Sequence, residues 1–353
     1  MRVRALQYLG VFVSAIVIFT CLNLGGWYTW GALVYAFIMV PIFDAILPSS
    51  TENMSKVEEE IAKKSRIYDY LVYLVVPVQY FLVFFTVYKL SLDTYTWVEY
   101  TGYISALGLA CGVFGINVAH ELGHRNKKYE QFLSKALLLT SLYMHFFIEH
   151  NQGHHKNVST TDDPASAKEG EWIYTFFFRS VIGGYISAWK LENNRLKKQG
   201  KSALSFSNEM IRYQIIQLGF IGLIFALFGL APMLSFIGAA IFGFLTLETV
   251  NYIEHYGLSR KKNELGAWEK TLPIHSWNSN HPVGRILLFE LTRHSDHHYI
   301  ANRPYQVLRH FDESPQMPTG YPGMMVMSLF PPVWFWVMGK ELKKLKESQP
   351  ALA

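Results

Sequence analysis

Six long apolar runs constrain the fold of this chain more than any other feature. They cover residues 6–24, 27–47, 69–90, 100–119, 211–230 and 233–250. Each is close to the ~20 residues that an α-helix needs to cross the hydrocarbon core of a bilayer. Backbone polar groups find no water in that core, so a spanning segment must satisfy them within a helix. We therefore expect an all-α integral membrane protein with six transmembrane helices.

The composition agrees with a membrane protein that keeps substantial polar parts. Half of the residues are apolar and 17% are charged. The first run lacks a small-residue cleavage site and leads through Gly25-Gly26 into the second, so we expect a retained hairpin and not a signal peptide. No basic block with interleaved aromatic residues is present, which argues against a nucleic acid partner. Cys21 and Cys111 lie inside apolar runs, where a disulfide is not expected.

The distribution of Lys and Arg predicts the orientation of the spans. Three connections are short and nearly free of these residues: 25–26, 91–99 and 231–232. Most of the positive charge falls in the other segments: 1–4, 48–68, 120–210 and 251–353. The positive-inside rule then places these segments, and both termini, in the cytoplasm. We expect a single domain over residues 1–353, with a histidine-rich cytoplasmic cap formed by 120–210 and 251–353.

Three further apolar segments are shorter or interrupted. Segments 131–149 and 172–189 adjoin a histidine cluster and a charged stretch, respectively, and 323–338 contains Pro331-Pro332. We interpret all three as partly buried or interfacial helices. A further pair of spans at the first two positions would leave the topology unchanged.

Three histidine clusters indicate a metal site. They are His120-Glu-Leu-Gly-His124, His150-Asn-Gln-Gly-His154-His155 and His294-Ser-Asp-His297-His298. Residues three or four apart share a helix face, so each cluster could offer two or three ring nitrogens to one metal. Eight imidazoles exceed the roughly four to six ligands of one ion and predict two ions. His255, at the end of the last run, is a ninth candidate. Imidazole binds iron, copper, zinc and nickel, so these residues do not name the metal.

Nearby carboxylates could orient these histidines. A ligating histidine usually donates its second ring nitrogen to a carboxylate or a carbonyl. Five acidic residues lie close enough in sequence, although each could equally be an ordinary charge: Glu121, Glu149, Glu254, Asp296 and Glu248. Glu248 lies inside an apolar run, where a carboxylate suggests a function. The four isolated histidines are expected to be ordinary hydrogen-bonding residues: His145, His275, His281 and His310.

The first cluster also matches the HExxH pattern of zinc metalloproteases. In that pattern the glutamate, here Glu121, is the general base. A protease would leave the other two clusters unexplained, so we reject this interpretation. We predict no catalytic residue beyond the metal ligands.

The motifs together resemble those of the alkane 1-monooxygenases, within the membrane desaturase and hydroxylase superfamily. The similarity covers about residues 10–338 in order and spacing. Besides the first two histidine clusters, it includes Asn251-Tyr-Ile-Glu-His-Tyr-Gly-Leu258, His275-Ser-Trp-Asn-Ser-Asn280, Leu291-Thr-Arg-His-Ser-Asp-His-His298 and Pro318-Thr-Gly-Tyr321. The motifs at 251–258 and 291–298 are more specific than generic histidine boxes.

This resemblance implies a six-helix membrane domain whose cytoplasmic cap holds two non-haem irons. Nine histidines would be the ligands: His120, His124, His150, His154, His155, His255, His294, His297 and His298. The implied reaction inserts one atom of O2 into a terminal methyl group of a medium- to long-chain n-alkane and releases the other as water. The implied location is the bacterial inner membrane.

The resemblance also implies that rubredoxin delivers the electrons. Two cysteines cannot form rubredoxin's four-cysteine site, so we expect a separate rubredoxin. A rubredoxin reductase would bind NADH and flavin, because this chain has no Gly-rich dinucleotide motif. Lys127-Lys128 and Arg260-Lys261-Lys262 could dock an acidic carrier. The apolar alkane would arrive from the bilayer, and run 27–47 is predicted to line part of its route.

Two kinds of alternative stay open at this point. The same di-iron centre could serve a xylene or other side-chain monooxygenase, or a fatty-acyl desaturase or hydroxylase. A membrane metal transporter is an alternative from a different class. The spans contain no ladder of ligands across the bilayer, which argues against transport.

Overall fold

A computed structural model describes residues 2–348 of the chain. Its regular secondary structure is helical: between residues 2 and 348 there are isolated bridges but no strand. Six segments in this part of the chain are long and apolar enough to cross a membrane: Arg4–Leu24, Gly26–Ile46, Ile67–Leu92, Trp97–Gly123, Glu209–Phe228 and Leu230–His255. They confirm the six predicted spans, with bounds that differ by a few residues; the largest extensions are at the C-terminal ends of two of them, at Gly123 and His255.

The helices are joined by short turns and by three longer, largely irregular stretches at 158–172, 256–281 and 300–320. In order, the α-helices are α1 (Arg2–Leu6), α2 (Gly10–Leu24), α3 (Gly31–Val34), α4 (Val40–Ile46), α5 (Lys56–Lys64), α6 (Ile67–Leu92), α7 (Trp97–Ala110), α8 (Asn117–Gly123), α9 (Lys128–Leu139), α10 (Phe146–Glu149), α11 (His155–Asn157), α12 (Ile173–Lys198), α13 (Glu209–Phe228), α14 (Leu230–His255), α15 (Pro282–Leu287), α16 (His294–Tyr299), α17 (Tyr321–Ser328) and α18 (Pro331–Ser348). Three π-helical segments interrupt them: η3 (Tyr35–Met39), η4 (Cys111–Ile116) and η5 (His150–His154). The 3-10 segments are η1 (Gln7–Leu9), η2 (Gly26–Trp30), η6 (Pro273–His275) and η7 (Tyr305–Val307).

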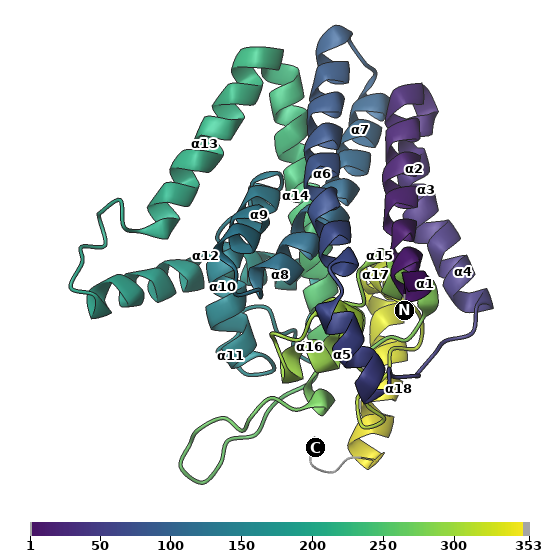
Figure 1. The fold of residues 1–353 in the computed structure, drawn as a ribbon, viewed down its shortest axis with the longest axis vertical. Coiled ribbons are helices and arrows are strands. Elements are labelled where there is room, and N and C mark those ends of the chain that lie inside the picture. Colours follow the sequence, from purple (N-terminus) through teal and green to yellow (C-terminus); the bar gives the residue numbers. More distant parts are fainter. Residues whose placement is uncertain (1, 349–353) are drawn as a thin grey trace.

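The spans form three hairpins whose turns lie at one end of the molecule, at the top of Figure 1. Gly25 ends α2 with φ 69° and Gly229 ends α13 with φ 88°. A residue with a side chain rarely adopts such angles, so glycine suits both turns. Thr96 and Glu99 form a capping box that starts α7 after the middle turn. Helices α5, α16 and α18 lie at the other end.

The segment Trp97–Gly123 is the most buried of the six spans. Its contact with α14 is very close, because a Cβ at Gly243 would lie 2.6 Å from Cβ of Cys111. Small residues of this kind let helix backbones approach each other in membrane proteins. Elsewhere on the spans, large apolar side chains are exposed, among them Phe81 (53%) and Leu218 (67%). Such surfaces suit contact with lipid.

The segments predicted to be interfacial are not among the six candidate spans. Helix α12 runs across the direction of the spans (Figure 1) and contacts α10 and α14. The segment around Pro331 divides into α17 and α18. Helices α8, α11 and α16 carry histidines of the three clusters.

Candidate metal centre

Four parts of the chain deliver the nine predicted histidines to one place. Helix α8, which continues the span from α7, carries His120 and is followed by His124. The π-helical turn η5 provides His150 and His154 of the second cluster, His155 begins α11, and α14 ends at His255. Helix α16 provides the third cluster. Two membrane spans and two segments outside them therefore converge on the site.

The nine side chains form two groups. The five-histidine group contains His120, His124, His150, His155 and His297, and the four-histidine group contains His154, His255, His294 and His298. Within each group, one nitrogen of every residue lies within 4.8 Å of the others. The structure thus gathers all nine predicted histidines, and their role as ligands remains a prediction.

The first cluster stays together in the five-histidine group, but the second and third are divided between the two groups, which corrects our expectation that the histidines of each cluster could bind one metal. His150 pairs with His155, five residues on, at an Nε2–Nε2 distance of 3.0 Å, whereas His154 points to the other group. The reason is the π-helical turn, in which hydrogen bonds connect residues five apart instead of four. Helix α16 is divided similarly, with His297 in one group and His298 in the other.

The five-histidine group has an arrangement that hydrogen bonds cannot satisfy. Its Nε2 atoms form a closed ring of neighbouring pairs at 2.9–3.3 Å: His120–His297, His297–His155, His155–His150, His150–His124 and His124–His120. An imidazole nitrogen in a neutral ring either donates or accepts, but does not do both. Donors and acceptors cannot alternate around a ring of five. A central cation would accept all five lone pairs, so these residues fit a bound metal.

Burial keeps most of these imidazoles neutral. Desolvation lowers the pKa of His124 to about 3, and it holds the pKa values of His150 and His297 well below the usual range. Neighbouring histidines lower the last two further. A neutral ring keeps the lone pair that a metal requires. Only His124 and His155 among the nine are partly exposed.

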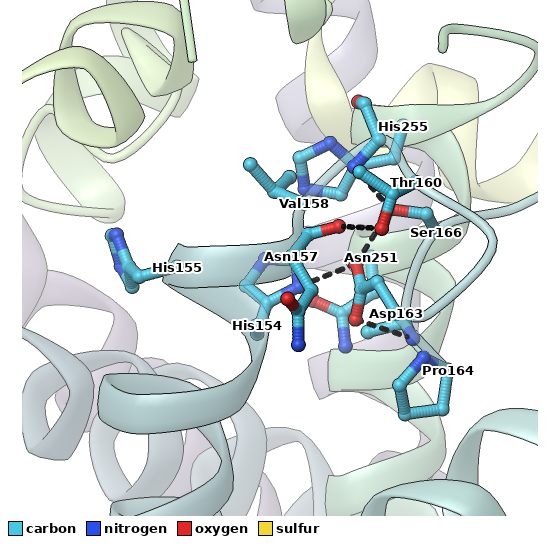
Figure 2. Close-up of polar contacts among 12 residues, drawn as sticks. His154, His155, Asn157, Val158, Thr160, Asp163, Pro164, Ser166, Asn251 and His255 are labelled. Carbon is cyan, nitrogen blue, oxygen red and sulfur yellow. Dashed lines mark hydrogen bonds and ion pairs between the residues drawn. The ribbon is translucent and has the colours of Figure 1, made fainter. Parts of the chain in front are cut away.

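The sequence analysis missed one carboxylate that contacts a predicted ligand. His154 Nδ1 donates to Asp163 Oδ2 at 2.9 Å, and both side chains are buried. Figure 2 shows the two facing each other, while His155 points away. Burial alone would lower the pKa of His154, but the Asp163 carboxylate outweighs it and raises that pKa. With Nδ1 protonated, Nε2 is left free to face His298 at 3.2 Å.

The loop around Asp163 is held in place by its own hydrogen bonds (Figure 2). Asp163 accepts hydrogen bonds from Ser166 Oγ and from the backbone N–H of Ala165. Ser166 Oγ in turn accepts from the N–H of Ser159, a non-glycine residue at φ 56°. Asp163 follows His154 by nine residues on an irregular loop, so neither spacing nor periodicity indicated this contact.

The five carboxylates predicted to support the histidines behave differently from one another. Glu254 Oε2 lies 3.1 Å from His294 Nε2, and Glu254 also accepts from Tyr321 Oη. Within residues 2–348, the other four make no hydrogen bond or ion pair with a ligand nitrogen: Glu121 pairs with Arg125, Asp296 pairs with Arg303, Glu248 accepts from Tyr143, and Glu149 Oε1 lacks a partner. Burial raises the pKa of Glu149 to about 8.

The four isolated histidines belong to neither group. His145 packs between Tyr143 and Tyr185, and His275 lies 3.2 Å from Glu269. His281 contacts Ser279, and His310 contacts Asn280. These contacts fit ordinary hydrogen-bonding and packing roles.

An apolar cavity of about 100 Å³ leads from the spans to the histidines. Its lining includes Tyr35, Phe37 and Val40 from the second span. At the other side it reaches residues of both histidine groups, His120 and His294. The arrangement can therefore hold an apolar molecule beside a metal centre.

Comparisons with known proteins agree with this arrangement. The fatty acid desaturase family model matches residues 95–327. The chain is 40% identical over 319 residues to alkane 1-monooxygenase 2 of Pseudomonas aeruginosa, covering 89% of this chain and 84% of that protein. It is 41% identical over 312 residues to alkane 1-monooxygenase of Ectopseudomonas oleovorans, covering 87% and 77%. The xylene/toluene monooxygenase hydroxylase component of Pseudomonas putida is 30% identical over 320 residues, covering 90% and 83%.

Proposed function

The chain belongs to the alkane 1-monooxygenases and to the broader fatty acid desaturase family, and on that premise we propose that it hydroxylates the terminal carbon of medium- to long-chain n-alkanes. The observation that carries the proposal is the apolar cavity, which connects the spans with both histidine groups. An alkane has no polar group to bind. Burial of its chain against apolar side chains is therefore its means of recognition.

We propose that the two histidine groups hold two non-haem irons, one in each group. When bound, the irons would supply the activation of O2 that hydroxylation of an inert C–H bond requires. The chain's own contribution is positioning and exclusion of water. Asp163 holds His154 with its Nε2 directed into the four-histidine group, and Glu254 with Tyr321 borders His294.

The second span is proposed to align the alkane. Tyr35, Phe37 and Val40 lie in η3 and at the start of α4, on the wall of the cavity. A cavity bounded by bulky side chains orders an extended alkane with its end towards the histidines, which favours reaction at a terminal methyl group.

We infer that the electrons come from a separate rubredoxin with its reductase. The histidine end of the molecule would face the cytoplasm of the bacterial inner membrane, with both termini on the same side. Of the two basic strips considered for docking, Lys127-Lys128 is exposed. Arg260 is not available, because it is 6% exposed and its guanidinium donates to the carbonyls of Val158, Lys156 and Glu269. Of the second strip, only Lys261 and Lys262 are therefore available for docking.

Side-chain oxidation of xylene is the second candidate, since the chain is 30% identical to a xylene/toluene monooxygenase hydroxylase component. Identity to the alkane enzymes is higher, at 40–41%. The discriminating experiment supplies purified protein with rubredoxin, reductase, NADH and O2, and compares octane, hexadecane, xylene and an acyl substrate. We expect 1-alkanols as the main products. Faster turnover of xylene or acyl substrate would contradict the proposal.

The basic strips can be tested with the same assay. Reversing the charge of Lys127, Lys128, Lys261 and Lys262 should weaken carrier-dependent turnover and flatten its dependence on salt, because steering by exposed charges is screened by ions. Unchanged turnover and salt dependence would exclude docking there.

A further inference from the structure

The proposed reaction requires protons as well as an alkane. Its balance is R–H + O2 + 2 e⁻ + 2 H⁺ → R–OH + H2O, with the electrons taken from reduced rubredoxin. Two protons must enter and one water must leave in each turnover. The apolar cavity is lined mainly by apolar side chains of the spans and offers protons no continuous polar route. A separate path is needed.

A second, polar cavity lies beside the histidines. It has a volume of about 10 Å³ and is lined by Glu149, Glu248, Ser180, His150 and His154, among others. About 10–15 Å³ is enough for one water molecule. Glu149 Oε1 is buried and has no protein partner within residues 2–348, so a water here would satisfy it.

The polar cavity is distinct from the apolar one. Phe146, His150 and Asn251 line both and form the partition between them. Glu248 lies on the polar side. Glu248 is 3% exposed, and its carboxylate accepts hydrogen bonds from Tyr143 Oη at 2.8 Å and from Ser180 Oγ. A carboxylate buried at this depth in a span is costly and suggests a function.

A larger depression of about 620 Å³ lies outside the polar cavity. Its lining includes exposed polar residues such as Asp162, Lys168 and Lys190. One residue, Pro164, lines both spaces. On α12, Gly183 faces the outer depression and Gly184 the inner cavity. The wall between the two spaces is therefore about one residue thick.

This wall is closely packed and clamped. A Cβ at Gly183 would lie 2.7 Å from Cβ of Pro164, so only glycine leaves room for the loop. Arg179 donates to the carbonyls of Pro164 and Ser166, each at 2.9 Å. Residues 163–166, which include the partner of His154, are thereby held against α12.

We propose that the outer depression, the polar cavity and Glu248 form a passage for water and protons to the metal centre, separate from the alkane's route. Water in the inner cavity, between Glu149 and Glu248, exchanges with the outer depression across Pro164. Protons pass along that water towards the histidines, and product water leaves the same way. The proposal rests on the proposed function and assigns these residues a part in it.

The test is Gly184→Ala, which closes the inner cavity with one methyl group. The nearest atom to the new Cβ is Glu149 Cγ at 3.8 Å, an ordinary contact, so the side chain fits. Alanine also favours the helix. Gly219→Ala on α13 is the matched control, because nothing lies within 4 Å of its Cβ. Glu248→Gln is a second variant, which keeps the shape of the side chain and removes its acid.

We expect Gly184→Ala and Glu248→Gln to lower kcat per iron at least fivefold and to enlarge the solvent deuterium isotope effect, with the alkane KM unchanged. Gly219→Ala should match the wild type. A structure at a resolution that shows ordered water should place one water on Glu149 in the metal-free wild type and none in Gly184→Ala.

Equal turnover by Gly184→Ala and Gly219→Ala would overturn the passage. Loss of metal from Gly184→Ala would also overturn the passage, because it would show that Gly184 maintains the structure of the metal centre. If the wild type made no alkanol, the proposed function would fail, and the passage would then be tested by the ordered water alone. Absence of that water from Glu149 in the wild type would overturn the passage as well.

Discussion

At the scale of single residues, the sequence identified the nine histidines but not their grouping. Spacing of three or four suggested that His150 and His154 would share one metal. The π-helical turn instead pairs His150 with His155. Local sequence does not reveal such a turn, because its geometry depends on the tertiary contacts that hold it. Asp163 was missed for a similar reason, since only the folded loop brings it to His154.

Asp163→Asn should weaken one metal site selectively. Asparagine keeps the size of the side chain but removes the charge that fixes the protonated Nδ1 of His154. Loss of a partner of this kind typically costs about 10–100-fold in metal affinity. Titration with a chelator should release one metal per chain at lower chelator concentration than in the wild type. Asp162→Asn is the control, because Asp162 is exposed and contacts Trp268 instead. Identical release curves would exclude this role for Asp163.

His145 should make the fold sensitive to acid. Burial lowers the pKa of His145 to about 4, whereas an unfolded histidine titrates near 6.5. Between these values the unfolded state binds more protons, so stability is complete above about pH 6.5 and falls as the pH drops towards 4. At pH 5 the loss is on the order of 1–2 kcal/mol.

The measurement is the thermal unfolding temperature of His145→Gln and wild type between pH 7 and 5. Lowering the pH from 7 to 5 should decrease the unfolding temperature of the variant less than that of the wild type. Parallel curves would mean that His145 does not contribute.

At the scale of elements, the sequence predicted the six spans well, because a bilayer imposes a length and a composition that single sequences display. The predicted spans ended at residues 119 and 250, whereas the structure continues these helices to Gly123 and His255. Histidines at the ends of these helices interrupt the apolar pattern. The histidines lie at these helix ends because the metal site requires them there, and the apolar pattern carries no information about that site.

The contact between η4 and α14 should be essential for the site as well as for the fold. Gly243→Val places a Cβ 2.6 Å from Cβ of Cys111, at the start of η4, and must separate the two spans. Overpacking of this kind costs about 1–3 kcal/mol. Because these helices lead to His120 and His255, bound metal should fall together with the unfolding temperature. Gly222→Val on α13, where nothing lies within 4 Å, should change neither. Full metal content in Gly243→Val would contradict the coupling.

At the scale of the whole molecule, the cavity joins the membrane spans to the histidine groups. Sequence analysis predicted that run 27–47 would line part of a route for the substrate, and Tyr35, Phe37 and Val40 do line the cavity. Which of its aromatic side chains would face inwards could not be predicted, since the run is apolar on all sides. Trp27 and Tyr28, at the start of the run, are exposed instead.

Phe37→Ala should shift the preferred alkane towards longer chains, because the smaller side chain lengthens or widens the cavity. One extra or missing methylene group in an apolar pocket changes kcat/KM by about 10–200-fold. An alkane series from octane to hexadecane measures it, with Trp27→Ala as the exposed control. If Phe37→Ala preferred the same alkane chain lengths as the wild type, the second span would not line the substrate's route.

The central claim is that one chain binds two irons and uses them to hydroxylate alkanes. The most direct measurement is iron content per chain, determined together with 1-alkanol formation from rubredoxin, reductase, NADH and O2. We predict two irons per chain at full activity, and loss of activity as either is removed. Full activity with one metal per chain would contradict the account.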